Sequence, residues 1–414
     1  MKTIFLKILK WSLKKLAQAV IRRYQPGIVA ITGSVGKTST KEAIKAVLCK
    51  ERRIRAASGN FNNEIGVPLT ILGDWQKIEK PIFLFWLKVI SSALVRVLFP
   101  RRSAYPEILV LEYAADRPGD IKELLEIARP QIAVVTAVGE IPVHVEFYSG
   151  PEALAREKAK IIEQLPTVGF AILNADDALV FDMKSRTRAQ VMTFGFSELA
   201  QIKITGFENA SNGEPTGVVF KLEYGGSFVP IKINNAFGKG QAYAAAAAAC
   251  VGLIFGVNLV KIAEALIENY QAPQRRMNLV PGVKETFIID DSYNASPLSM
   301  KAALETLRAL KSKRKIAVLG DMLELGKYSL EAHEEIGKFA AGIVDLLFTV
   351  GPRAKFIAAA ANKAGLAKEN ILSFLIAEEV KKEVELKIKK GDLILVKGSR
   401  AIGLDKVVDE IKQM

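Results

Sequence analysis

The chain contains few of the residues that bind transition metals or form disulfides. Its 414 residues include two cysteines, Cys49 and Cys250, and two histidines, His144 and His333. The cysteines stand in no C-x-x-C motif, which indicates a reducing compartment, and two histidines exclude a metal site built from several histidine ligands. We therefore expect the protein to work in the cytoplasm.

Segments typical of secretion or of a membrane span are also missing. The N-terminal segment has no apolar region followed by a small-residue cleavage site, so secretion is not expected. The most apolar run, residues 81–99, contains Lys88 and Arg96, and these charges argue against a span. This run predicts a buried helix, with a helix at a membrane interface as the alternative.

Acidic residues are scarce in the two segments that hold most of the net charge of +14. Residues 1–26 contain seven Lys/Arg and no acid, and residues 76–102 contain six Lys/Arg and one acid. Elsewhere the chain is nearly neutral and has no recognition-helix or zinc-finger motif. We therefore expect no nucleic-acid partner.

Residues 2–24 fit a basic amphipathic helix. Its apolar positions recur along one side and its lysines along another: Phe5, Leu9, Leu13, Leu16 and Val20, against Lys7, Lys10 and Lys14. Such a helix either docks on the next domain with its lysines in water or lies on an anionic membrane. Peripheral membrane contact through residues 1–26 and 81–99 thus stays an alternative.

From residue 27 onward, apolar runs of strand length alternate with helical patterns. GIVAIT, EILVLE and QIAVVTAV predict a parallel sheet covered by helices. Residues 200–234 change to alternating strands with glycine turns, which predicts an antiparallel flap. A second strand–helix alternation starts after residue 273. The sequence therefore predicts an α/β protein with two α/β units.

A phosphate-binding loop is predicted at residues 31–40, ITGSVGKTST. The common P-loop would place a glycine at position 31, where Ile31 stands. Gly33 and Gly36 allow backbone amides to approach phosphate oxygens, and the following helix adds further donors. Lys37 offers a positive charge to the β- and γ-phosphates, and Thr38 offers a hydroxyl to Mg²⁺. A strand before the loop and a helix after it favour nucleotide binding.

Two further residues are candidate magnesium ligands. Glu112 ends an apolar run, so it is expected at the carboxyl edge of a parallel sheet, where ligands bind. His144 follows the next predicted strand. A single histidine is more often structural, so His144 alone carries little weight.

Seven stretches, in order from about residue 27 to the C-terminus, resemble the Mur ligases. They are ITGSVGKTST, NFNNEIGVPLTIL, LEYAADRPGDI, HVEFYSGPEALAREKAKIIEQLP, IIDDSYNASPLSMKAAL, AVLGDMLELG and VKGSR. NNEIGVPLT, DDSYNASP and LGDMLELG resemble most the subgroup that adds D-alanyl-D-alanine. In this family the loop reads T-G-x-x-G-K-T, so Ile31 is the family's own form.

The resemblance implies a domain organisation and a reaction. It implies a P-loop central domain with a mostly parallel sheet at residues 27–273 and a Rossmann-like domain at 274–414, preceded by the basic helix at 1–26. A carboxylate of a muramoyl-tripeptide, a peptidoglycan precursor, would attack ATP and form an acyl phosphate. D-Ala-D-Ala would then displace phosphate, leaving an amide, ADP and phosphate. A monomeric, magnesium-dependent enzyme is expected.

The resemblance also implies roles for individual residues. ATP would be bound by Gly33, Ser34, Gly36, Lys37, Thr38, Ser39, Gln241, Arg276 and Asp291. Magnesium would be bound by Thr38, Glu112, His144 and Lys158, the last as a carbamylated lysine that bridges to a second ion. Lys37, His144 and Lys158 would be catalytic. The substrates would lie near Asn62, Asn63, Asn294, Lys397, Ser399 and Arg400, with Tyr293 beside Asn294.

Three departures from the family pattern bear on recognition. About 26 residues precede the loop, where the family has a domain that binds the UDP moiety, so a different mode of acceptor binding is expected. The family's G-x-H-N-x-x-N-A reads GKGQAYAA, with Gly240, Gln241 and Ala244 at the changed positions, which leaves selectivity for ATP over GTP open. Ala137 replaces the asparagine of T-N-x-G.

Two alternatives to this function remain. One is a related ATP-dependent amide ligase of the folylpolyglutamate, poly-γ-glutamate or cyanophycin type, acting on an acceptor without UDP. The other is a non-catalytic, nucleotide-dependent scaffold at the membrane. Retention of Lys37, Glu112, His144 and Lys158 argues against the scaffold.

Overall fold

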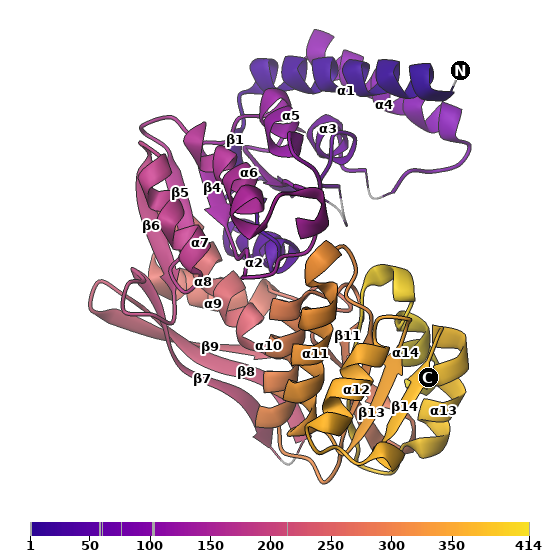
Figure 1. Ribbon diagram of the computed structural model, residues 1–414. Coiled ribbons are helices and arrows are strands. Elements are labelled where there is room, and N and C mark those ends of the chain that lie inside the picture. The colour runs from indigo at the N-terminus through magenta and orange to yellow at the C-terminus, as the bar shows by residue number, and fades with distance from the viewer. Residues whose placement is uncertain are drawn as a thin grey trace.

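The protein consists of two α/β units, each built on its own sheet, in the computed structural model (Figure 1). The structure describes residues 2–57, 59, 61–75, 77–101, 104–212 and 214–413. The side chains of residues 2–5 and 212 lie outside this description, and with them the apolar position predicted for Phe5. The prediction of a mixed α/β fold with mostly parallel sheets is confirmed.

The first unit has a nine-stranded sheet in the order β2-β3-β1-β4-β5-β6-β7-β8-β9. Strands β2 to β7 pair in parallel, and the β7–β8 and β8–β9 pairs are antiparallel, as the alternating pattern of residues 200–234 predicts. The bounds are β1 Gly27–Thr32, β2 Ile54–Ala56, β3 Ile108–Glu112, β4 Ile132–Val135, β5 Phe170–Asn174, β6 Gln190–Gly195, β7 Ile202–Asn212, β8 Glu214–Tyr224 and β9 Ser227–Asn234.

Helices cover both faces of this sheet, because its parallel strands are apolar on both sides. Alternate residues of β1 show the division: Val29 and Ile31 pack with α2, α8 and α9, whereas Ile28 and Ala30 pack with α1, α3, α4, α5 and α6. The bounds are α1 Lys2–Tyr24, α2 Lys37–Leu48, α3 Gly66–Leu72, α4 Ile82–Leu98, α5 Asp120–Ile127, α6 Pro151–Glu163, α7 Ala178–Phe181, α8 Lys239–Ile254 and α9 Leu259–Asn269.

Helix α1 docks on the first unit, as one of the two sequence alternatives predicts. Its buried residues Leu9, Leu13 and Val20 belong to the same core as α3 and α5. Lys10 and Lys14 form ion pairs with Glu64 and Glu126 at the rim of the contact. The apolar period of 3.6 residues thus places one side of α1 on the protein.

The prediction that residues 81–99 form a buried helix is wrong. Helix α4 buries Phe85, Trp86, Val89 and Ala93, which lie on one side, whereas most of its other large apolar residues are exposed: Ile82, Phe83, Leu84, Leu87, Leu94, Val95 and Leu98. Helix α4 carries more apolar residues than its neighbours α1 and α3 cover. Composition alone therefore predicts more burial than the packing provides.

The second unit has a six-stranded sheet in the order β10-β11-β15-β12-β13-β14, parallel except for the β10–β11 pair. Its strands are β10 Asn278–Gly282, β11 Thr286–Asp291, β12 Lys315–Gly320, β13 Leu346–Val350, β14 Ile371–Phe374 and β15 Leu393–Lys397. Its helices are α10 Pro297–Ala309, α11 Ser329–Ala341, α12 Lys355–Lys363, α13 Ala377–Lys387 and α14 Asp405–Ile411. The domain boundaries at residues 26 and 273 stay predictions.

Candidate active site

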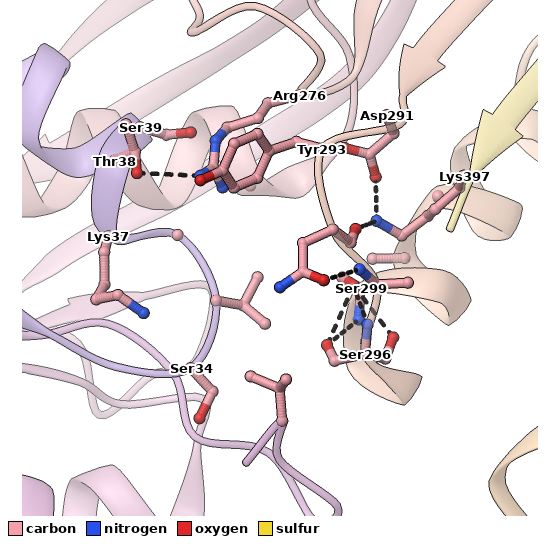
Figure 2. Close-up of a pocket in the computed structure, with 18 of the residues that line it drawn as sticks. Ser34, Lys37, Thr38, Ser39, Arg276, Asp291, Tyr293, Ser296, Ser299 and Lys397 are labelled. Carbon is pink, nitrogen blue, oxygen red and sulfur yellow. Dashed lines mark hydrogen bonds and ion pairs between the residues drawn. The ribbon is translucent and has the colours of Figure 1, made fainter. Parts of the chain in front are cut away.

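A cavity of about 730 Å³ lies between the two units. The loop after β1 and the start of α2 line it on one side, and the segments after β11 and β15 line it on the other (Figure 2). The carboxyl ends of parallel strands are where α/β proteins bind ligands, because helix N-termini and loops converge there. Both units therefore contribute to one site.

The phosphate loop has the shape that its glycines predict. Gly33 and Gly36 have φ angles of 143° and 89°, which favour glycine. A Cβ on Gly33 would lie 2.0 Å from Oγ1 of Thr136. That hydroxyl donates a 2.6 Å hydrogen bond to the carbonyl of Val35 and so supports the loop from β4. Thr136 could not be singled out from the sequence, because it lies about a hundred residues from the loop.

Two lysines converge on this loop. The ammonium groups of Lys37 and Lys158 donate hydrogen bonds of 2.7 and 3.1 Å to the carbonyl oxygen of Gly33. Burial lowers the pKa of both lysines, most strongly for Lys158, whose side chain is 1% exposed. Their closeness adds to the effect on Lys158. An anion bound in the loop would relieve this repulsion.

The oxygen groups suited to magnesium lie next to the loop. The hydroxyl of Thr38 is 3.2 Å from both carboxylate oxygens of Glu112, and Lys41 lies 3.8 Å from that carboxylate. The hydroxyl of Ser34 is buried without a hydrogen-bond partner among the described residues. Hard oxygen donors and an unsatisfied hydroxyl fit a magnesium–phosphate group. Among the described residues, no three His, Cys, Asp or Glu side chains form a ready-made metal site.

His144 joins the two units. Its Nε2 lies 3.3 Å from Oδ1 of Asp116, and its Nδ1 lies 2.5 Å from Oε2 of Glu324, in a contact without hydrogen-bond alignment. Burial lowers the pKa of His144 to about 4, although Asp116 favours the protonated form. The ring is therefore neutral at neutral pH, the form in which histidine binds metals. Asp116 and Glu324 were not singled out from the sequence, although both stand inside the quoted stretches.

Arg276 reaches the phosphate loop from the start of the second unit. Its guanidinium donates a 3.1 Å hydrogen bond to Oγ1 of Thr38 and lies 4.1 Å from the centre of the Tyr293 ring. Figure 2 shows the guanidinium of Arg276 against the ring of Tyr293, with the dashed line to Thr38 beside them. Arg400 lies near the same ring, at 5.7 Å. The loop and the second unit thus meet through one charged side chain.

Asp291 and Lys397 form a buried ion pair at the cavity wall. Their atoms Oδ2 and Nζ lie 2.5 Å apart, and Lys397 also donates to the carbonyl of Asn294 at 2.8 Å. Burial raises the pKa of Asp291, and the ammonium of Lys397 offsets part of this effect. Lys397 was expected near the substrates; it lines the cavity, where its ammonium group is paired with Asp291 and the carbonyl of Asn294.

Three other predicted residues already have partners within the protein. Gln241 accepts a 2.7 Å hydrogen bond from Tyr270 and donates a longer one to the carbonyl of Arg276. The side chain of Asn63 accepts from the amides that begin α3. Ser399 accepts from the amide of Leu323. Asn63 is absent from the cavity lining, whereas Asn62, Ser39, Asn294, Ser399 and Arg400 belong to it.

The sequence matches two protein-family descriptions. "Mur ligase middle domain" covers residues 31–82 and 94–252, and "Mur ligase, glutamate ligase domain" covers residues 275–400. The UDP-N-acetylmuramoyl-tripeptide–D-alanyl-D-alanine ligase of Bacillus subtilis (strain 168) is 31% identical over 402 residues, which are 97% of this chain and 79% of that protein. The ligase of the same name from Escherichia coli (strain K12) is 29% identical over 96% of this chain and 80% of its own length.

Solved structures agree with the sequence matches. MurF from Acinetobacter baumannii aligns with a TM-score of 0.78 at 25% identity, over 97% of this chain and 80% of that one. MurF ligase from Thermotoga maritima in complex with ADP aligns with a TM-score of 0.77 at 27% identity, over 97% and 83% of the two chains. These matches, together with the phosphate loop that faces a second α/β unit, show that the chain belongs to the Mur ligase family.

Proposed function

We propose that the protein is an ATP-dependent ligase that joins D-alanyl-D-alanine to a muramoyl-tripeptide precursor of peptidoglycan and releases ADP and phosphate. One observation carries this proposal: the phosphate loop of the first unit and Arg276 of the second unit meet in one cavity. The named relatives share this function, and one aligned structure is an ADP complex. The acyl-phosphate route needs such a meeting, because the nucleotide and both substrates react at one point.

The phosphate loop holds ATP in this proposal. Amides of the loop and of the first turn of α2, from Gly33 to Ser39, bind the phosphate oxygens, and Lys37 neutralises their charge. Arg276 approaches the same phosphates from the second unit. Asp291 lies where the family has its ribose-binding acid, and Gln241 acts indirectly, because its amide is used within the protein.

Thr38 and Glu112 would hold one Mg²⁺ ion, and His144 and Lys158 would help to hold a second. Bound there, magnesium would neutralise charge on the phosphates during transfer. The protein's own part is to keep these side chains close together: Thr38 and Glu112 are already in contact, and Asp116 and Glu324 lie against the ring of His144.

Lys158 would become carbamylated, as the family resemblance implies. Its side chain is buried beside Lys37 and the carbonyl of Gly33. The ammonium group loses one proton, and the neutral amine then adds CO₂ and releases a second proton, so that one positive charge of the crowded pair is replaced by a negative one. Because burial and Lys37 disfavour the ammonium form, the amine is well suited to this reaction.

The substrates would bind on the remaining wall of the cavity. Asn62, Asn294, Ser399 and Arg400 line it, and Arg400 offers an exposed guanidinium to a carboxylate. Lys397 shapes this wall through Asp291. We further propose that the protein acts as a monomer in the cytoplasm, with peripheral membrane contact through residues 1–26 and 81–99.

One assay tests the proposal. The purified protein receives ATP, Mg²⁺, D-Ala-D-Ala and UDP-MurNAc-tripeptide, and we expect phosphate release together with an amide product of the corresponding mass. Lys37→Ala should abolish both signals, whereas Lys45→Ala, an exposed lysine on the same helix, should leave them unchanged. Turnover only with an acceptor that lacks UDP would instead support a related amide ligase, and no turnover with any acceptor would refute the ligase.

A further inference from the structure

Helix α4 presents an apolar face to solvent. Its exposed residues Phe83, Leu87, Leu94 and Leu98 follow one another at spacings of four, seven and four, so they form one stripe along the helix. Leu84 and Val95 widen the stripe. Phe83 is 70% exposed. A helix that rests on a soluble protein normally carries polar residues on its outer side, so this face indicates an interaction surface.

Helix α1 extends this face. The two helices lie side by side at the end of the molecule farthest from the six-stranded sheet (Figure 1). At its end nearest the N-terminus, α1 exposes Ile8 and Trp11, the latter by 62%. An exposed tryptophan beside an apolar stripe is typical of the boundary between membrane and water, where its ring is both apolar and polar.

The charges around this surface are almost all positive. Exposed lysines and arginines lie on both helices and on the segments that flank α4: Lys7, Lys15, Arg22 and Arg23, together with Lys77, Lys80, Lys88 and Arg101. Of the nearby acids, Glu64 and Glu126 are paired with Lys10 and Lys14, and Asp74 and Glu79 lie on the segment that leads into α4, where Lys77 and Lys80 flank Glu79. The surface is therefore apolar in the middle and basic around its margin.

We propose that α1 and α4 dock the protein on an anionic phospholipid bilayer, with the apolar stripe of α4 in the interface and the surrounding basic residues on the lipid headgroups. Charge decides between this partner and a second copy of the chain. Two copies in contact would bring equal positive surfaces together, whereas anionic headgroups complement them. Among the described residues no helix is long and apolar enough to cross a membrane, so the contact is with the surface.

Docking at this end leaves the cavity accessible. Helix α3 lies between the α1–α4 surface and the second unit (Figure 1). The segment of Asn62, which lines the cavity, leads directly into α3. In the docked enzyme, Asn62 would thus lie on the side of the cavity nearer the membrane, while the second unit stays in solution. This inference goes beyond the proposed ligase activity and does not depend on it.

Vesicle binding of the full-length protein tests the proposal. We expect cosedimentation with phosphatidylcholine vesicles that contain about 25% phosphatidylglycerol, weaker binding to pure phosphatidylcholine, and loss of binding as salt increases. Leu87→Ser with Leu94→Ser should lower the partition coefficient about tenfold or more. Lys7→Glu with Lys15→Glu should lower it about tenfold as well.

Matched controls exist on the second unit. Leu386→Ser changes a leucine on α13 that is 72% exposed, and Lys363→Glu changes an exposed lysine on α12. Neither should alter vesicle binding. Trp11 provides a readout that needs no destabilising variant: its fluorescence should be quenched by brominated acyl chains, and Trp11→Phe should remove most of the quenching, because Trp86 is buried and Trp75 is half-buried.

The possible results separate clearly. Absence of binding to the anionic vesicles, or equal binding to neutral ones, would overturn the proposal. A dimer in light scattering that Leu87→Ser with Leu94→Ser dissolves would also overturn it, in favour of self-association. Lys37→Ala should still bind vesicles, and the α4 variant should still turn over soluble substrates. A failure of docking is therefore distinguishable from a failure of the ligase function.

Discussion

The guanidinium of Arg276 donates a 3.1 Å hydrogen bond to the hydroxyl of Thr38, across 238 positions of the chain. This contact connects the second unit to the first turn after the phosphate loop. Thr38 is in turn in contact with Glu112. A change in the position of the second unit would therefore directly alter the contacts of Thr38 at the candidate nucleotide site.

Removing this arginine should affect catalysis more than stability. For Arg276→Ala we expect kcat/KM for ATP to fall about 10- to 100-fold, because a charged hydrogen-bond donor is lost. The neighbouring Arg275 pairs with Asp405 at 2.8 Å on the surface, so Arg275→Ala serves as the control. Steady-state phosphate release measures both variants. Equal losses in both would show that the arginine at 276 acts only through local folding.

The two glycines Gly33 and Gly240 should respond differently to alanine. A Cβ at Gly33 would meet the Thr136 hydroxyl at a positive φ, so Gly33→Ala should lower the free energy of unfolding by about 1–3 kcal/mol and weaken ADP binding. Gly240 has open space around it and lies in the first turn of α8. Gly240→Ala should leave stability unchanged or raise it slightly. Urea titration and calorimetry with ADP check both; normal ADP affinity in Gly33→Ala would contradict the expectation.

The buried pair of Asp291 and Lys397 should show strong coupling. Asp291→Asn leaves the ammonium of Lys397 buried without its counter-ion, which should cost about 3–5 kcal/mol of unfolding free energy. Adding Lys397→Met should restore part of the loss. The exposed pair of Lys390 and Glu285 provides the control, since Lys390→Met should cost less than about 1 kcal/mol. Additive effects at Asp291 and Lys397 would show that the pair is not coupled.

The histidines should make stability depend on pH. Burial lowers the pKa of both His333 and His144 below the ordinary value of 6.5. As pH falls below about 6.5, the unfolded chain therefore binds protons that the folded protein does not, and stability decreases. His333 accepts from the amide of Met322 and is fully buried, so His333→Gln should flatten this dependence. Urea midpoints from pH 7.5 to 5 test this; an unchanged slope would contradict it.

Lys158 should carry a carbamate in the active enzyme. Incubation with ¹³C-bicarbonate should produce a carbamate signal in the NMR spectrum that Lys158→Ala lacks, and this variant should lose activity by about 100-fold or more. Arg156→Ala is the matched control, because Arg156 is an exposed cation on the same helix. An active wild-type enzyme without the signal would mean that Lys158 acts as an ammonium group.

The fold and the phosphate loop could be predicted because their signals are local. The spacing of apolar residues shows which side of a strand or helix is buried, and the glycines at 33 and 36 specify a loop conformation by themselves. The antiparallel flap at residues 200–234 was predicted for the same reason. What a face packs against is not a local property, and for α4 the prediction of burial was wrong.

The sequence by itself determined which helices and strands form, and which residues lie at the carboxyl ends of the strands beside the candidate phosphate site. Gly33, Lys37, Thr38 and Glu112 could be predicted there from the apolar strands and the residues at or after their ends. Only the tertiary structure decided how side chains are used once distant segments meet. In the folded chain, Lys397 forms an ion pair with Asp291, and Gln241 accepts a hydrogen bond from Tyr270. Glu324 lies beside His144, and the outer face of α4 stays uncovered. Hydrogen bonds and ion pairs act over a few ångströms, so their partners are fixed only when the chain is folded.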